Sequence, residues 1–276
     1  GLYDRAEQLL LDLAAQSTDF SATAQRHLLE VYEAQRDWSA AVTIAEQLVT
    51  LAAAGEPSAA GHGQPAHLLR GHYLCEQAEA AVADGDAEAA QNLYEEALRD
   101  QPQDLRARMG LARGKLSEGD TVAAMQHFNA VMDSGRTCTP ELLELLSAIC
   151  DAQGDKDLYL TSLRRYYEQQ DSSLLALALA NELGQRDGDE SAEAFLRRTL
   201  EGRPSVSVAA ALVLKALQSD ASLPERRVLD QLVSNQAGYQ CDHCGFSGQT
   251  RHWRCPGCRH WDSIHYQGSA QGEAHG

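Results

Sequence analysis

The sequence lacks long apolar runs and has few positive charges. No stretch of about 18 apolar residues occurs in it, and no basic segment followed by an apolar one opens it. It therefore predicts neither a membrane-spanning helix nor a secretion signal among these residues. Lysine and arginine number 23 against 40 aspartates and glutamates, a formal net charge of −17. Because such a charge repels polyanions, we expect no nucleic-acid partner.

Aromatic residues and the well-known catalytic motifs are also scarce. Phenylalanine, tryptophan and tyrosine form only 6% of the chain, whereas β-strands are enriched in them. The sequence has no Walker loop, G-x-S-x-G elbow, H-E-x-x-H helix or dinucleotide-binding glycine pattern. Alanine, leucine and glutamate are prominent instead, and these residues favour helices. We therefore expect an all-α protein that is not an enzyme.

Cysteine occurs seven times, an odd number that does not match a secreted disulfide framework. Cys75, Cys138 and Cys150 stand alone in helix-like sequence, and we expect them to be small buried apolar residues rather than reactive thiols. The other four form two close pairs near the end of the chain. This usage favours a reducing, cytoplasmic compartment.

A period of 34 residues, typical of tetratricopeptide repeats, runs through the helical part of the sequence. In the second helix of such a repeat, small residues recur where two helices approach closely. One copy has Gly85, Ala90, Tyr94, Ala97 and Pro102; the next has Gly119, Ala124, Phe128 and Val131; three periods after the first come Ala192, Leu196, Thr199 and Pro204. A degenerate copy between them starts at Gly154 and has Tyr159, Leu163 and Tyr166 at its packing positions. The sequence predicts a tetratricopeptide-repeat superhelix.

These patterns divide the chain into five segments. Residues 1–51 are N-terminal repeats that begin inside a repeat, so we expect the natural protein to continue upstream. Residues 52–66 are rich in glycine, proline and alanine and predict a loop insertion. Residues 67–236 are further repeats and capping helices, 237–266 a metal-binding module, and 267–276 a disordered tail.

The module contains two C-x2-C pairs separated by ten residues: Cys241, Cys244, Cys255 and Cys258. Each pair can bend into a knuckle, and two knuckles make a tetrahedral four-thiolate site. One Zn2+ per chain is the first expectation, and a single iron of the rubredoxin type is the alternative. A closed site of this kind contributes folding free energy rather than hydrolytic catalysis. Gly245 follows the first pair where a positive φ is needed, but Arg259 occupies the matching place in the second.

Aromatic residues are concentrated in the module. We expect Tyr239, Phe246, Trp253 and Trp261 to form its core or to dock on the helices. If they dock on the last helices, removal of the metal should loosen residues 204–234. A local cluster of basic side chains is interpreted as a solvated face or a protein-docking surface; it consists of Arg251, His252, Arg254, Arg259 and His260.

The concave face of a repeat superhelix is formed by the first helix of each repeat and is the usual binding surface. Counting along the 34-residue period places six side chains there as candidate partner-binding residues: His72, Glu79, Arg106, Met109, Arg113 and Asn181.

The combination of these repeats with a terminal "YQCDHCGF...WRCPGCRHW" module resembles the lipopolysaccharide assembly protein B family. The resemblance implies a rubredoxin-like metal module with the four cysteines as ligands. It also implies an N-terminal anchor, absent from this sequence, that would hold the protein on the cytoplasmic face of the bacterial inner membrane. The implied role is an adaptor that helps the protease FtsH degrade the deacetylase LpxC and so limits lipopolysaccharide synthesis. Two alternatives remain: a rubredoxin-type redox protein, and a general peptide-binding co-chaperone. A homodimer is compatible with a repeat array.

Overall fold

The computed structural model describes residues 2–16, 18–54, 64–216 and 238–267. The chain divides into two compact units, residues 1–114 and 115–276. The expected all-α repeat fold is confirmed, and a small three-stranded sheet follows the helices. Among the described residues no helix is both long enough and apolar enough to cross a lipid bilayer.

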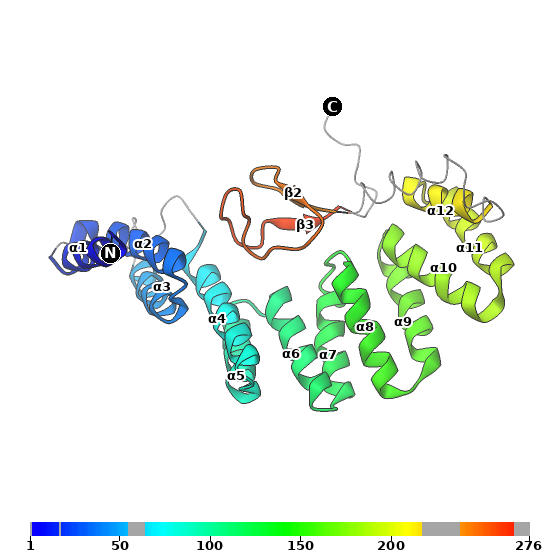
Figure 1. Cartoon of the computed structure of the whole chain (residues 1–276), viewed down its shortest axis with the longest axis horizontal. Helices are drawn as coiled ribbons and strands as arrows, with labels where there is room; N and C mark the ends of the chain where they lie inside the picture. Colours follow the sequence, from blue (N-terminus) through cyan, green and yellow to red (C-terminus); the bar gives the residue numbers. More distant parts are fainter. Residues whose placement is uncertain (1, 17, 55–63, 217–237, 268–276) are drawn as a thin grey trace. The chain divides into compact units, whose positions relative to one another are not determined.

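The first unit is a succession of helices in which each packs against the next (Figure 1). Five of its helices lie wholly within it: α1 (Leu2–Gln16), α2 (Thr18–Gln35), α3 (Trp38–Ala53), α4 (Ala66–Ala83) and α5 (Ala87–Asp100). Helix α6 (Leu105–Ser117) starts in this unit and ends in the second. The predicted loop insertion falls between α3 and α4, and its residues 55–63 lie outside the described part of the chain.

The second unit continues the same pattern and adds the strands. Its helices are α7 (Thr121–Asp133), α8 (Pro140–Gln153), α9 (Lys156–Gln169), α10 (Ser173–Asp187), α11 (Asp189–Gly202) and α12 (Val206–Ala216). Helix α12 is the first of the two predicted capping helices. The second capping helix and the predicted disordered tail lie outside the described residues.

A repeated Gly-Asp dipeptide turns the chain between the two helices of a repeat. Gly85, Gly119 and Gly154 have φ between 74° and 82°, a region that costs glycine little. The aspartate that follows each glycine caps the next helix by accepting a hydrogen bond from a backbone N–H, as Asp86 does from Ala89. These two residue types therefore account for the turns between the helices of a repeat.

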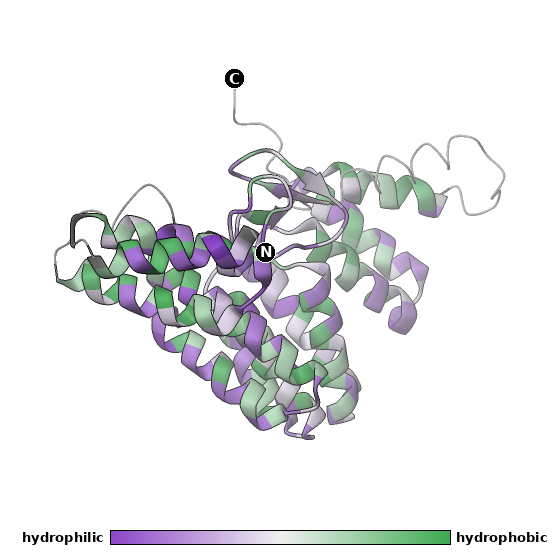
Figure 2. Cartoon of the chain, turned by 60° about the vertical axis from the view of Figure 1, so that its left-hand side comes forward, coloured by the Kyte–Doolittle hydropathy of each residue, from purple (hydrophilic) through white to green (hydrophobic). Residues whose placement is uncertain are grey.

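The periodic residues of the sequence form the helix interfaces. Ala90, Tyr94 and Ala97 are buried in one cluster with Leu74 and Cys75. Along the helices, hydrophobic stretches alternate with hydrophilic ones (Figure 2), as expected for helices that bury one stripe each. The isolated cysteines are buried as predicted, and burial raises the pKa of the Cys138 thiol to about 12.

At Gly110, helix α6 packs closely against the Tyr94 side chain of α5. A Cβ atom at this position would lie 2.3 Å from Cζ of the buried Tyr94 ring. Gly110→Ala should therefore lower the free energy of unfolding by about 1–3 kcal/mol, because the overlap outweighs the better helix propensity of alanine. Chemical denaturation followed by circular dichroism measures this.

Gly114 provides the control for Gly110 in the same helix. No atom lies within 4 Å of a Cβ placed there, so Gly114→Ala should be neutral or stabilising by up to about 1 kcal/mol. Tyr94→Leu should partly rescue Gly110→Ala. Equal effects of the two glycine substitutions would contradict the steric explanation.

Candidate metal centre

A small antiparallel sheet positions the first knuckle. Its strands are β1 (Tyr239–Cys241), β2 (Ser247–Gly248) and β3 (Ile264–Tyr266), in the order β2-β1-β3. Tyr239 pairs with both Gly248 and Tyr266, so the central strand is held from two sides. Cys241 ends this central strand and is fixed opposite Ile264.

The two C-x2-C pairs form knuckles with the same backbone hydrogen bonds. The N–H of Gly245 donates to the carbonyl of Cys241, and the N–H of Arg259 donates to the carbonyl of Cys255, both at 2.9 Å. Gly245 has φ 74° and Arg259 has φ 63°. The arginine thus adopts the left-handed conformation that glycine adopts in the first knuckle.

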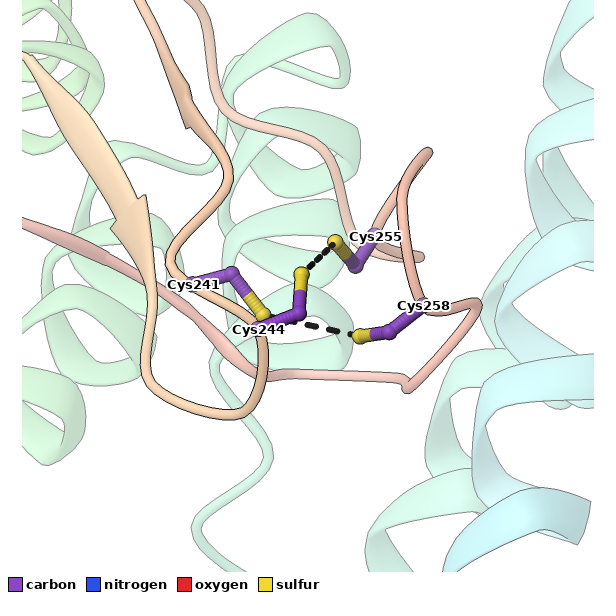
Figure 3. Close-up of side chains that lie close together, drawn as sticks. All are labelled: Cys241, Cys244, Cys255 and Cys258. Atoms are coloured by element: carbon purple, nitrogen blue, oxygen red, sulfur yellow. Dashed lines mark hydrogen bonds between the residues drawn. The ribbon is translucent and has the colours of Figure 1, made fainter.

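The knuckles bring the four thiols together (Figure 3). The Sγ atoms of Cys241 and Cys258 lie 3.7 Å apart, as do those of Cys244 and Cys255. All four lie within 4.8 Å of one another. Zn–S bonds of about 2.3 Å in a tetrahedron place sulfur atoms about 3.8 Å apart. The donor set therefore fits a metal ion, and this geometry does not distinguish zinc from iron.

The surroundings of the thiols differ from one cysteine to the next. Desolvation would raise the pKa of the Cys241 thiol, but its hydrogen bond with Ser263 and nearby backbone N–H groups lower that pKa to about 6. Desolvation and hydrogen bonds with the other thiols raise the pKa of Cys258 to about 12. Without a metal the cluster therefore keeps protons, and a bound dication would displace them.

Substitution of Arg259 by glycine measures the free-energy cost of the left-handed backbone conformation at this position. No ion pair or hydrogen bond involves its side chain among the described residues, so Arg259→Gly changes mainly the backbone. Relief of the left-handed strain should stabilise the metal-loaded module by up to about 1 kcal/mol, and Gly245→Ala should cost about 1–2 kcal/mol. Titration of the loaded protein with a chelator measures both. Identical chelator midpoints for the three proteins would contradict the prediction.

The module is attached to the turn before α8 and to the start of α8. The Tyr239 hydroxyl donates to Oε1 of Glu141 at 2.6 Å, and Arg136 forms an ion pair with Asp262 at 3.3 Å. These two contacts lead to the α8 repeat, whereas the expected docking on the last helices stays a prediction, because residues 217–234 lie outside the described part of the chain. A buried tyrosine usually has a hydrogen-bond partner for its hydroxyl, and the half-buried Glu141 provides one for Tyr239.

Side chains predicted as a basic surface are partly used inside the module. Arg251 lies over the rings of Tyr239 and Trp253, 5.3 and 5.0 Å from their centroids, and Arg254 lies 5.6 Å from the Trp261 centroid. Tyr239 and Trp261 are buried, as expected for core aromatics. These guanidinium groups stabilise the module by cation–π contact.

The Tyr239–Glu141 contact predicts a pH dependence. Desolvation would raise the pKa of Glu141, but the hydrogen bond from Tyr239, further hydrogen bonds from Thr139 and the backbone, and the charge of Arg251 together lower it. A lowered folded pKa contributes stability above the unfolded value of about 4.3, and this stability is lost as the pH falls through the folded value. Glu141→Gln should thus lose about 1–3 kcal/mol of docking free energy at pH 7 and little at pH 3. Comparison of the two proteins by denaturation at each pH cancels any metal loss common to both; a constant difference would contradict the assignment.

The candidate partner-binding residues separate into two groups. His72, Arg106 and Met109 are buried, whereas Glu79, Arg113 and Asn181 are exposed. Arg106 donates to Glu76 and Glu79 at 2.6–2.7 Å, which holds its guanidinium between two carboxylates. The expectation that all six side chains line an open surface is therefore wrong for the three buried ones.

Fold and site together define a tetratricopeptide-repeat protein with a four-cysteine metal-binding domain. Comparison with known families agrees: a model described as "Tetratricopeptide repeat" matches residues 81–149, and one described as "Rubredoxin metal binding domain" matches residues 239–265.

Related proteins with one shared name match almost the whole chain. The chain is 28% identical over 272 residues to "Lipopolysaccharide assembly protein B" of Escherichia coli K12, covering 96% of this chain and 67% of that protein. It is 24% identical over 271 residues to the protein of the same name from Haemophilus influenzae, covering 96% and 65%. The resemblance to the lipopolysaccharide assembly protein B family is confirmed, and the chain spans about two thirds of the length of these relatives.

Proposed function

We propose that this protein is a non-enzymatic adaptor in lipopolysaccharide assembly that presents the deacetylase LpxC to the membrane protease FtsH at the cytoplasmic face of the inner membrane. The observation that carries the proposal is the similarity to lipopolysaccharide assembly protein B along 96% of the chain, through both repeats and metal domain. Repeat arrays of this kind bind proteins, and a closed four-thiolate site leaves no coordination position for a substrate.

A transplant experiment tests this role. The chain would be joined to the N-terminal segment of the Escherichia coli relative and expressed in cells depleted of that relative. The half-life of LpxC, followed by immunoblotting after translation is stopped, should shorten several-fold, and FtsH should co-purify with the chimera. A folded, membrane-located chimera that leaves LpxC stable would overturn the proposal.

In this proposal the partner contacts the exposed candidates Glu79, Arg113 and Asn181. Glu79 and Arg113 would act from the first unit, and Asn181 from α10 in the second. Substitution of these residues by alanine should weaken co-purification of the partner without changing metal content. Cys241, Cys244, Cys255 and Cys258 are proposed to hold one Zn2+ that stabilises the module.

A rubredoxin-type iron centre is the second candidate, since the four thiols fit either metal. An iron-loaded protein should absorb visible light and bleach on reduction. A colourless protein with one zinc per chain would remove this candidate.

A further inference from the structure

A pocket of about 420 Å3 lies among α9, α10 and α11 in the second unit. Its volume is in the range of about 300–1,000 Å3 that is usual for binding pockets. Its lining comes from all three helices and consists of Arg164, Tyr167, Glu168, Leu179, Leu183, Asp187, Ser191, Ala194, Phe195 and Arg198. It plays no part in the metal centre.

Part of the pocket lining is apolar. The rings of Tyr167 and Phe195 meet edge to face with centroids 5.3 Å apart, which joins α9 to α11. Leu179 and Leu183 are buried residues of α10 and complete the apolar lining. An apolar side chain of a partner would therefore find contacts from three helices.

Two arginines of the lining have no partner among the described residues. Three neighbouring arginines of these helices do form ion pairs: Arg165 with Asp133, Arg186 with Asp157, and Arg197 with Glu193. Arg164 on α9 and Arg198 on α11 form no ion pair or hydrogen bond in the described part of the chain. In a protein with 40 carboxylates and 23 basic residues, two unpaired guanidinium groups beside one pocket are available to an external carboxylate.

The lining also limits how much negative charge a partner can bring. Glu168 and Asp187 contribute two carboxylates, so the formal charge of the lining is zero and a polyanion gains no net attraction. A partner with a single carboxylate still has two unpaired guanidinium groups to bind in this lining. Arginine binds carboxylates with directed hydrogen bonds.

We propose that this pocket binds a short internal segment of a partner protein that presents one aromatic or leucine-sized side chain next to one carboxylate. The apolar side chain packs on Tyr167, Phe195 and the two leucines, and the carboxylate binds Arg164 and Arg198. The second helices α9 and α11 contribute most of this surface, whereas the adaptor role above uses first helices. The inference therefore does not depend on the pathway in which the protein acts.

A library of random twelve-residue peptides displayed on phage provides the probe. Selection on the immobilised protein should enrich peptides with an apolar residue adjacent to a single Asp or Glu. A fluorescent copy of an enriched peptide should bind at least tenfold more weakly to Arg164→Gln/Arg198→Gln and to Ala194→Trp, which fills the pocket from its exposed rim. Fluorescence polarisation measures the affinities.

Arg165→Gln/Arg197→Gln is the matched control. It removes the same charge from the same two helices outside the pocket, and it should retain peptide affinity within about twofold. Melting curves establish that each variant is folded. Ala194→Trp blocks the pocket without removing a charge, so it separates the role of the pocket from a general effect of net charge. Absence of enrichment, a basic or purely polar consensus, or equal binding to the pocket variants and the control would overturn the proposal.

Discussion

Replacing Cys241 and Cys255 by serine should abolish metal binding and unfold residues 239–266. One thiolate is lost from each knuckle, so the remaining two cannot close a tetrahedral site. Structural zinc in small domains contributes an apparent binding free energy of about 10–16 kcal/mol, far more than a three-stranded sheet of this size can replace. Native mass spectrometry with elemental analysis should give one metal per chain in the parent protein and close to none in the variant.

The isolated cysteines provide the control for this experiment. Cys150→Ser alters a buried thiol outside the metal cluster and should leave the metal content unchanged. Hydrogen exchange shows which part of the chain is affected. Metal removal should increase amide exchange at the start of α8, where Glu141 accepts the hydrogen bond from Tyr239, and should leave exchange in α12 unchanged. A variant that retains its metal, or deprotection confined to α12, would contradict the assignment.

Replacing Arg70 by methionine should strongly destabilise the first unit. The Arg70 side chain is 13% exposed and binds Glu46 of α3 and both Glu96 and Asp100 of α5. Without the arginine, three carboxylates remain close together with no counter-charge. Loss of one partner from a buried ionic cluster costs about 3–5 kcal/mol, and we expect about 2–4 kcal/mol here because the acids are partly exposed.

Denaturation of the Arg70→Met protein at neutral pH measures this effect. Arg70→Lys should recover part of the loss, since it restores charge without the forked geometry of the guanidinium group. Arg99→Met is the control on α5, because Arg99 is exposed and makes no ion pair among the described residues; it should change stability by less than about 0.5 kcal/mol. Similar losses for both methionine variants would refute the role given to the cluster.

The features predictable from the sequence are the local ones. The Gly-Asp dipeptides specify the turns because each needs only its own φ angle and a nearby N–H. The C-x2-C spacing brings the thiols together because each knuckle closes within a few residues. Arg259 departs from the glycine rule, but the hydrogen bonds of its knuckle hold it at φ 63° nonetheless.

The features that escaped prediction depend on residues far apart in the chain. Nothing near Glu141 or Arg136 indicates that Tyr239 and Asp262 will reach them. Likewise, the 34-residue period predicts the helix that carries Arg106, but it does not predict that Glu76 and Glu79 bind its guanidinium group. Both cases involve long side chains that pair between separate elements of the fold, and the repeat pattern predicts the helices but not the partner of a given side chain.

The contact between Tyr239 and Glu141 spans 98 positions of the sequence, which has a consequence during synthesis. Helix α8 leaves the ribosome long before β1 exists, and at about 5–20 residues per second the delay is on the order of 5–20 s. Until β1 has been made, the module cannot cover the surface that will receive Tyr239, and α9 to α12 are synthesised during the same interval. Closing so long a loop also carries an entropic cost that grows with the logarithm of its length. Attachment of the module is therefore expected to be a late step in folding. Until the last residues emerge, the α8 repeat is accessible to chaperones or premature partners.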